Sequence, residues 1–239
     1  MSSSGIPAEL TVPTGSTGAG SFFVVEVVDA RGNSATDTTK VFALSDGGDT
    51  VSIPEAGAIT FGLGGDDIIF GTGGSDVISG GAGNDVIIGG GGADVLSGGS
   101  GADVFRYLSA SDSGVAWGDF DTIMDFNSAE GDRIDLSAAV VSNNTTVMDL
   151  GTFRVTETFE DPRPGVDPVQ RLDARASFEN GYAAANTAMN SNDGVVMFFF
   201  DDGADGYLVI DKDQDGATPD MVIKFAGVTD VLDSAAFIL

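Results

Sequence analysis

Five aspartates recur every nine residues in the middle of this 239-residue chain. Written as successive units, residues 62–106 read GLGGDDIIF, GTGGSDVIS, GGAGNDVII, GGGGADVLS and GGSGADVFR. The sixth position is always aspartate, at Asp67, Asp76, Asp85, Asp94 and Asp103. The first and fourth positions are always glycine, the fourth being Gly65, Gly74, Gly83, Gly92 and Gly101. Carboxylates next to glycine-rich turns, whose backbone carbonyls are accessible, are the oxygen ligands that a hard divalent cation prefers.

The elements that would position these carboxylates are short turns and strands. Each unit has six turn residues and three strand residues, and its eighth residue is always large and apolar. That residue faces inward, because neighbouring side chains of a strand point to opposite faces. Two units make one coil, so every second unit stacks at about 4.8 Å. This predicts Asp67 over Asp85 over Asp103 on one edge, and Asp76 over Asp94 on the other.

Stacked carboxylates create an electrostatic problem. Two of them about 5 Å apart repel by roughly 3 kcal/mol at an effective dielectric constant near 20. A cation between successive turns reverses the sign, and calcium fits because it accepts carboxylates and carbonyls in flexible coordination, whereas magnesium demands a stricter octahedron. Zinc would favour nitrogen or sulfur ligands. We therefore expect several Ca²⁺ ions and a coil that is loose or unfolded without them.

An alternative is that the aspartates only accept hydrogen bonds from turn amides. Asparagine or serine would serve that purpose equally well. The alternative therefore does not account for aspartate at all five positions.

Two further groups of aspartates are candidate ligands. Asp112 and Asp121 stay in the nine-residue phase, and the Asp-x-apolar step recurs at 121–123 and 132–134. Near the C-terminus, Asp211, Asp213 and Asp215 form a DxDxDG sequence. This is either a calcium loop or an acidic hairpin turn, since its twelfth position is Val222 where an EF-hand has a bidentate glutamate.

The composition excludes several classes of function. Histidine and cysteine are both absent, which removes imidazole-based catalysis, thiolate metal sites and disulfides. The formal net charge is −27, so we expect no binding to nucleic acid or to anionic membranes. No apolar run reaches the roughly 18 residues of a membrane span, and residues 1–10 do not have the features of a secretion signal.

The chain divides into four expected regions. Residues 1–20 are a linker, and 21–61 form a β-hairpin segment with a turn at 30–33 that resembles the last hairpin of a bacterial immunoglobulin-like repeat. Residues 62–137 form the coil. Residues 138–239 form a C-terminal cap, in which we expect one helix within 172–189 and a meander of strands at 195–200, 206–210 and 221–225.

The nonapeptides resemble GGxGxDxUx, the calcium-binding repeat of the RTX (repeats-in-toxin) proteins. Two later segments, DTIMDFNSAEGDRIDLS at 121–137 and the stretch from Tyr207 to Leu239, are similar to the C-terminal domain of serralysin-type proteases. The resemblance implies a mainly β fold, with a right-handed parallel β-roll and a capping meander. It also implies export by type I secretion machinery through a C-terminal signal near Phe237-Ile238-Leu239. There is no HExxH motif for a protease.

These observations predict a non-catalytic calcium-binding module of a secreted or cell-surface bacterial protein, either a monomer or part of a larger chain. One alternative is the C-terminal part of a surface adhesin or layer protein, with cell-surface or matrix components as partners. A third hypothesis is a polysaccharide-acting enzyme with its site in 138–200.

Overall fold

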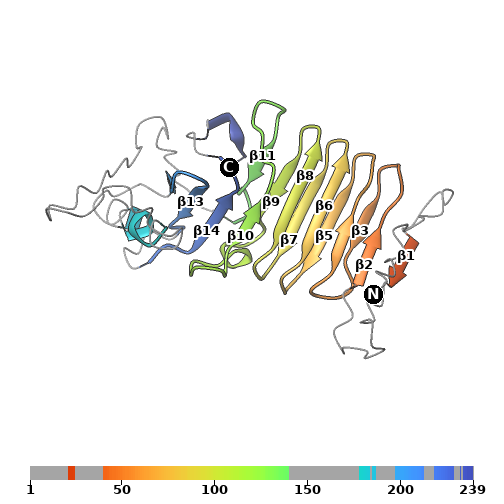
Figure 1. The fold of residues 1–239 in the computed structure, drawn as a ribbon, viewed down its shortest axis with the longest axis horizontal. Helices are drawn as coiled ribbons and strands as arrows, with labels where there is room; N and C mark the ends of the chain where they lie inside the picture. Colours follow the sequence, from red (N-terminus) through yellow and green to blue (C-terminus); the bar gives the residue numbers. More distant parts are fainter. Residues whose placement is uncertain are drawn as a thin grey trace, which may run out of the picture.

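Two sheets build the described part of the chain (Figure 1). The computed structural model describes residues 21–24, 40–139, 178–183, 185–186, 197–212, 218–228, 232 and 234–238. In sheet order, the nine-stranded sheet contains β1 (Ser21–Val24), β2 (Lys40–Ala43), β4 (Ile59–Phe61), β6 (Val77–Ala82), β8 (Val95–Ser100), β10 (Asp121–Ile123), β14 (Met221–Phe225), β13 (Gly206–Ile210) and β12 (Met197–Asp201). The six-stranded sheet contains β15 (Phe237–Ile238), β11 (Arg133–Asp135), β9 (Val104–Arg106), β7 (Val86–Gly90), β5 (Ile68–Thr72) and β3 (Thr50–Ser52).

Successive units of the coil alternate between the two sheets. β4 pairs in parallel with β6, and β6 with β8, in a register that places Ile59 beside Val77 and Val77 beside Val95. β5, β7 and β9 repeat this arrangement in the other sheet. The predicted parallel stacking of every second unit is therefore confirmed.

The parallel stack begins before residue 62, where the predicted coil started. β2 pairs in parallel with β4, and β3 with β5, so the stack includes β2 and the two further units 44–52 and 53–61. The first of these, LSDGGDTVS, keeps aspartate at its sixth position. A search for the glycine pattern misses these units because they have other residues at glycine positions. The parallel backbone pairing that defines a turn of the coil still forms with those residues. Upstream, β1 and β2 form an antiparallel pair, while the predicted linker and the turn at 30–33 lie outside the described residues.

The C-terminal cap continues both sheets. β12, β13 and β14 form the predicted antiparallel meander, and β14 also pairs in parallel with β10 of the coil. β15 pairs in parallel with β11. Helical residues at 178–183 and 185–186 fall within the helix predicted at 172–189. Figure 1 shows the meander beside β10, at the opposite end of the coil from β1 and β2.

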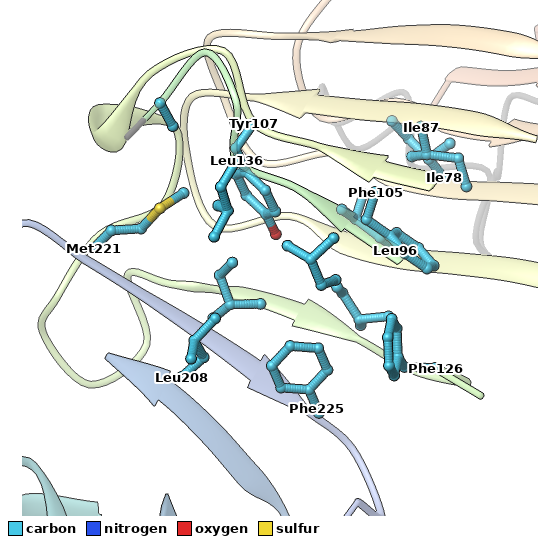
Figure 2. Close-up of a cluster of buried hydrophobic side chains, with 14 of the residues drawn as sticks. Ile78, Ile87, Leu96, Phe105, Tyr107, Phe126, Leu136, Leu208, Met221 and Phe225 are labelled. Atoms are coloured by element: carbon cyan, nitrogen blue, oxygen red, sulfur yellow. The ribbon is translucent and has the colours of Figure 1, made fainter. Parts of the chain in front are cut away.

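A single row of inward side chains forms the core of the coil. The eighth residues of the five units are at most 1 % exposed: Ile69, Ile78, Ile87, Leu96 and Phe105. The row continues through Phe126, between β10 and β11, into the cap, where Leu208 and Phe225 extend the same cluster (Figure 2). On the other face of the meander, Phe198, Phe200 and Tyr207 pack with Phe178 of the helical segment in a second cluster. Because both faces are buried, the strands of the meander are almost continuously apolar.

One inward position of the coil is polar. Thr60 stands at the eighth position of unit 53–61, is 1 % exposed, and its hydroxyl has no hydrogen-bond partner. Thr60→Val removes an unsatisfied buried hydroxyl, so we expect the free energy of unfolding to rise by about 1 kcal/mol. Denaturant titration in excess calcium measures the change, and Thr50→Val at an exposed position of β3 is the control with little expected effect. A destabilised Thr60→Val chain would show that the hydroxyl is in fact satisfied.

Candidate metal centre

The aspartates of the repeat form two ladders along the edges of the coil. On one edge, the backbone N–H of Asp67 donates to Oδ1 of Asp85 at 2.8 Å, and that of Asp85 donates to Oδ1 of Asp103 at 2.8 Å. On the other edge, the N–H of Asp76 donates to Oδ1 of Asp94, also at 2.8 Å. The order predicted for each edge is therefore present. In each pair, Oδ1 of the aspartate that comes later in the chain joins its turn to the preceding turn on that edge.

Each ladder extends beyond the five units. Asp49 N–H donates to Oδ1 of Asp67 at 2.7 Å, and Asp103 N–H donates to Oδ1 of Asp132 at 3.0 Å. On the other edge, Asp94 N–H donates to Oδ1 of Asp121 at 2.8 Å. Asp49 and Asp132 were not predicted as site residues, although the Asp-x-apolar step in Asp49-Thr50-Val51 marks a further rung.

Asp112 keeps the nine-residue phase but is not a rung of either ladder. Its Oδ2 accepts hydrogen bonds from the N–H groups of Leu108 and Ser109, at 2.8 and 2.9 Å, within the turn that leads into the 3₁₀ helix η1 (Ala110–Asp112). Asp121 takes the place above Asp94. The unit starting at residue 107 begins with a buried tyrosine, Tyr107, instead of glycine, and the chain makes a longer excursion before it returns to the edge.

The second carboxylate oxygen of most rungs is buried without a hydrogen-bond partner. This holds for Oδ2 of Asp67, Asp85, Asp94, Asp103 and Asp121. An ionised oxygen in that state carries a large desolvation cost unless a cation or a proton neutralises it. In the described ranges, no three acidic side chains converge on one point. A cation held here would therefore combine such a carboxylate oxygen with backbone carbonyl oxygens.

The first glycine of the unit leaves room beside this oxygen. A Cβ placed on Gly62, Gly80, Gly89 or Gly98 would lie within 2.5 Å of Oδ2 of the aspartate in the same unit. A Cβ on Gly62 would also contact the carbonyl oxygen of Gly80, which belongs to the next turn on that edge. Oxygens from two successive turns thus face one small space, and this donor set fits calcium.

The fourth glycine permits the turn itself. Gly65, Gly83, Gly92 and Gly101 have positive φ angles, which glycine adopts without steric cost. A Cβ at Gly83 would also collide with the carbonyl of Gly65 in the preceding turn on that edge. Gly74 lies outside this group, since its φ is not positive.

Burial raises the pKa of the ladder carboxyls. Desolvation is the main cause, opposed by the hydrogen bond from the backbone of the preceding rung. Desolvation raises the pKa of Asp67 and Asp103 to about 6, that of Asp94 to about 7 and that of Asp121 to about 8. The pKa values of Asp85 and Asp132 are raised by the same cause. Without a cation, protons are partly retained on the ladder near neutral pH.

The DxDxDG sequence lies in the connection between β13 and β14. Asp211 is buried at the end of β13, and Lys212 N–H donates to Oδ2 of Asp220 across the connection at 2.8 Å. Asp213 and Asp215 lie outside the described residues.

Parallel turns with carboxylate ladders on both edges define a cation-binding β-roll. The family model of the RTX calcium-binding nonapeptide repeat (4 copies) matches residues 61–96 and 70–105. The chain therefore carries RTX calcium-binding repeats, as the sequence predicted, and its repeat region is a structural metal-binding module of the β-roll type.

Two solved structures from Azotobacter vinelandii are similar to this chain. The AlgE6R3 subunit of the mannuronan C5-epimerase shows 25% identity and a TM-score of 0.36, with 82% of this chain and 80% of that chain covered. The AlgE6R2 subunit shows 23% identity and a TM-score of 0.32, with coverages of 86% and 95%. No curated protein matches the chain. Within the described segments, no helix has the length and hydropathy needed to cross a membrane.

Proposed function

We propose that the roll is a non-catalytic folding module that takes its ordered form when calcium binds outside the cell. One observation carries this proposal, namely the set of buried Oδ2 atoms without partners in the ladder. Asp67, Asp85, Asp94, Asp103 and Asp121 would hold the ions together with carbonyl oxygens of the glycine turns. Bound calcium would neutralise these carboxylates and link each turn to its neighbour on the same edge.

The expected affinity follows from the site's exposure to extracellular calcium. Sites of extracellular modules bind at about 10⁻⁴ to 10⁻³ M. At low cytosolic calcium such sites would be empty, so the chain would stay unfolded and could pass through a channel. At the higher calcium concentration outside the cell the ladder would fill and the roll would fold.

Export by type I secretion machinery is the second part of the proposal. The proposed signal includes Phe237 and Ile238, which form β15. Phe237 is buried and pairs with Ile134 of β11, so a receptor could reach this segment only before β15 docks. This placement supports recognition of an unfolded chain, followed by folding after export.

Two neighbouring aspartates provide a matched test of the calcium sites. Asp67 is buried and its Oδ2 has no partner, whereas Asp66 is exposed and accepts a hydrogen bond from the N–H of Asn84 at 2.7 Å. Asp67→Asn and Asp66→Asn make the same change in net charge. Calorimetric titration with Ca²⁺ is expected to show the loss of about one ion, or an affinity at least tenfold weaker, only for Asp67→Asn.

The same titration with Mg²⁺ separates a calcium site from general screening of the acidic chain. We expect much weaker binding of Mg²⁺, because its small octahedral shell suits a flexible carbonyl-rich turn poorly. Equal effects of Asp66→Asn and Asp67→Asn, or no saturable calcium binding, would contradict the proposal.

A further inference from the structure

Two turns of the roll satisfy Oδ2 of their aspartate with a side-chain hydroxyl instead of a metal ion. In unit 71–79, the backbone N–H and the hydroxyl of Thr72 donate to Oδ2 of Asp76 at 2.9 and 2.8 Å. In unit 44–52, Ser45 makes the same pair of bonds to Oδ2 of Asp49, at 2.9 and 2.7 Å. Both hydroxyls stand at the second position of their units and also accept the N–H of the fourth residue, Gly74 or Gly47. We call these hydroxyl-capped turns.

The other repeat turns have a different backbone at the second position. Leu63, Gly81, Gly90 and Gly99 occupy it, and all four have positive φ angles, whereas Thr72 does not. In each of these four units Oδ2 of the aspartate has no hydrogen-bond partner. The choice between the two kinds of turn therefore follows the residue at the second position, although the aspartate at the sixth position is the same.

The first glycine of unit 71–79 shows the consequence for the carboxylate. A Cβ placed on Gly71 would have its three nearest atoms within 3.2 Å, and none of these atoms belongs to Asp76. At Gly62, Gly80, Gly89 and Gly98 the corresponding Oδ2 lies within 2.5 Å. Thr72 thus holds the Asp76 carboxylate away from the space that the other aspartates face.

We propose that Asp76 does not hold calcium, and that Thr72 at the second position is the residue that excludes the ion. This inference rests on the proposed function of the other rungs. The two donors direct positive charge at Oδ2 and replace the stabilisation that a cation supplies elsewhere. Asp49 is excluded in the same way by Ser45.

Capped and uncapped rungs are separated within each edge of the roll. On one edge, Asp49 is hydroxyl-capped, the next three rungs have an unpartnered Oδ2, and Oδ2 of Asp132 accepts the N–H of Asn127 at 2.8 Å. On the other edge, Asp76 is capped and precedes the unpartnered Asp94 and Asp121. Within each edge the unpartnered rungs are therefore consecutive and follow a hydroxyl-capped rung, whereas in chain order the capped Asp76 lies between the unpartnered Asp67 and Asp85.

Counting the ions bound per chain tests this assignment. Equilibrium dialysis with radioactive calcium at saturation is the measurement, applied to the full chain and to Thr72→Gly, Thr72→Ser, Asp76→Asn and Asp67→Asn variants. Thr72→Gly is expected to bind one more ion than the natural chain, because it removes the hydroxyl and allows positive φ. Thr72→Ser keeps the cap, and Asp76→Asn alters a rung that holds no ion, so both should leave the count unchanged, whereas Asp67→Asn should lower it by one.

The outcomes separate this inference from the proposed function. A natural chain that binds no calcium contradicts the proposed function. A natural chain that binds calcium but loses an ion in Asp76→Asn, or gains none in a folded Thr72→Gly, overturns the role of Thr72. If Thr72→Gly does not fold, the comparison of Asp76→Asn with Asp67→Asn decides the assignment.

Discussion

Removal of calcium at neutral pH is expected to unfold the uncapped part of the roll, with loss of most of its β-sheet circular dichroism signal. The core of the coil is one inward side chain per unit, so few apolar contacts oppose the cost of five buried carboxylate oxygens without partners. If calcium stands tenfold above its dissociation constant, each site adds about 1.4 kcal/mol. Five such sites add about 7 kcal/mol, which is comparable with the whole stability of an ordinary domain.

Chelation followed by addition of excess calcium measures this effect and its reversibility. Sodium chloride at matched ionic strength is the control for screening of the net charge of −27; it should recover little of the signal, because screening does not supply a ligand to a buried oxygen. The hydroxyl-capped turns should retain more protection from hydrogen exchange than the turns of Asp85 and Asp94. An unchanged spectrum and unfolding transition in chelator would overturn the calcium-dependent fold.

The effect of pH on stability is expected to change sign with calcium. In the metal-free chain, burial raises the pKa of Asp94 to about 7 and that of Asp121 to about 8, above the ordinary value near 4. The folded chain then binds more protons than the unfolded chain between about pH 4 and 8, so its stability falls as pH rises through this window. Calcium binds the ionised carboxylates in competition with protons, so the calcium-dependent stability rises over the same window.

Thermal unfolding at about pH 5.5 and about pH 8 tests the sign, with metal-free protein prepared on a chelating resin and with protein in excess calcium. We expect the metal-free chain to be more ordered at the lower pH and the calcium-loaded chain to have its higher midpoint at the higher pH. Asp94→Asn and Asp121→Asn should each flatten the metal-free profile. The same slope with and without calcium would contradict the raised pKa values as its cause.

Much of the candidate site can be predicted from local pattern. The nine-residue period identifies the inward residue of each unit, and it also predicts that Asp67, Asp85 and Asp103 share one edge. These predictions succeed because the inward position and the edge depend on the residue types within one unit. The predicted strand of three residues is too short, since β5, β6, β7 and β8 have five or six residues and continue into the next unit. The carboxylates on which the proposed calcium sites depend belong to the same repeat.

The sequence by itself determined the periodic coil, its inward row and the carboxylates along its edges. Only the tertiary structure decided that the parallel stack starts at β2, that Asp121 lies above Asp94, and that Asp76 is capped while Asp94 is not. The physical reason is the range of the interactions. A repeat records what each unit can form locally, whereas the partner of a buried oxygen depends on the backbone path of its turn and on rungs that lie 18 or 27 residues away.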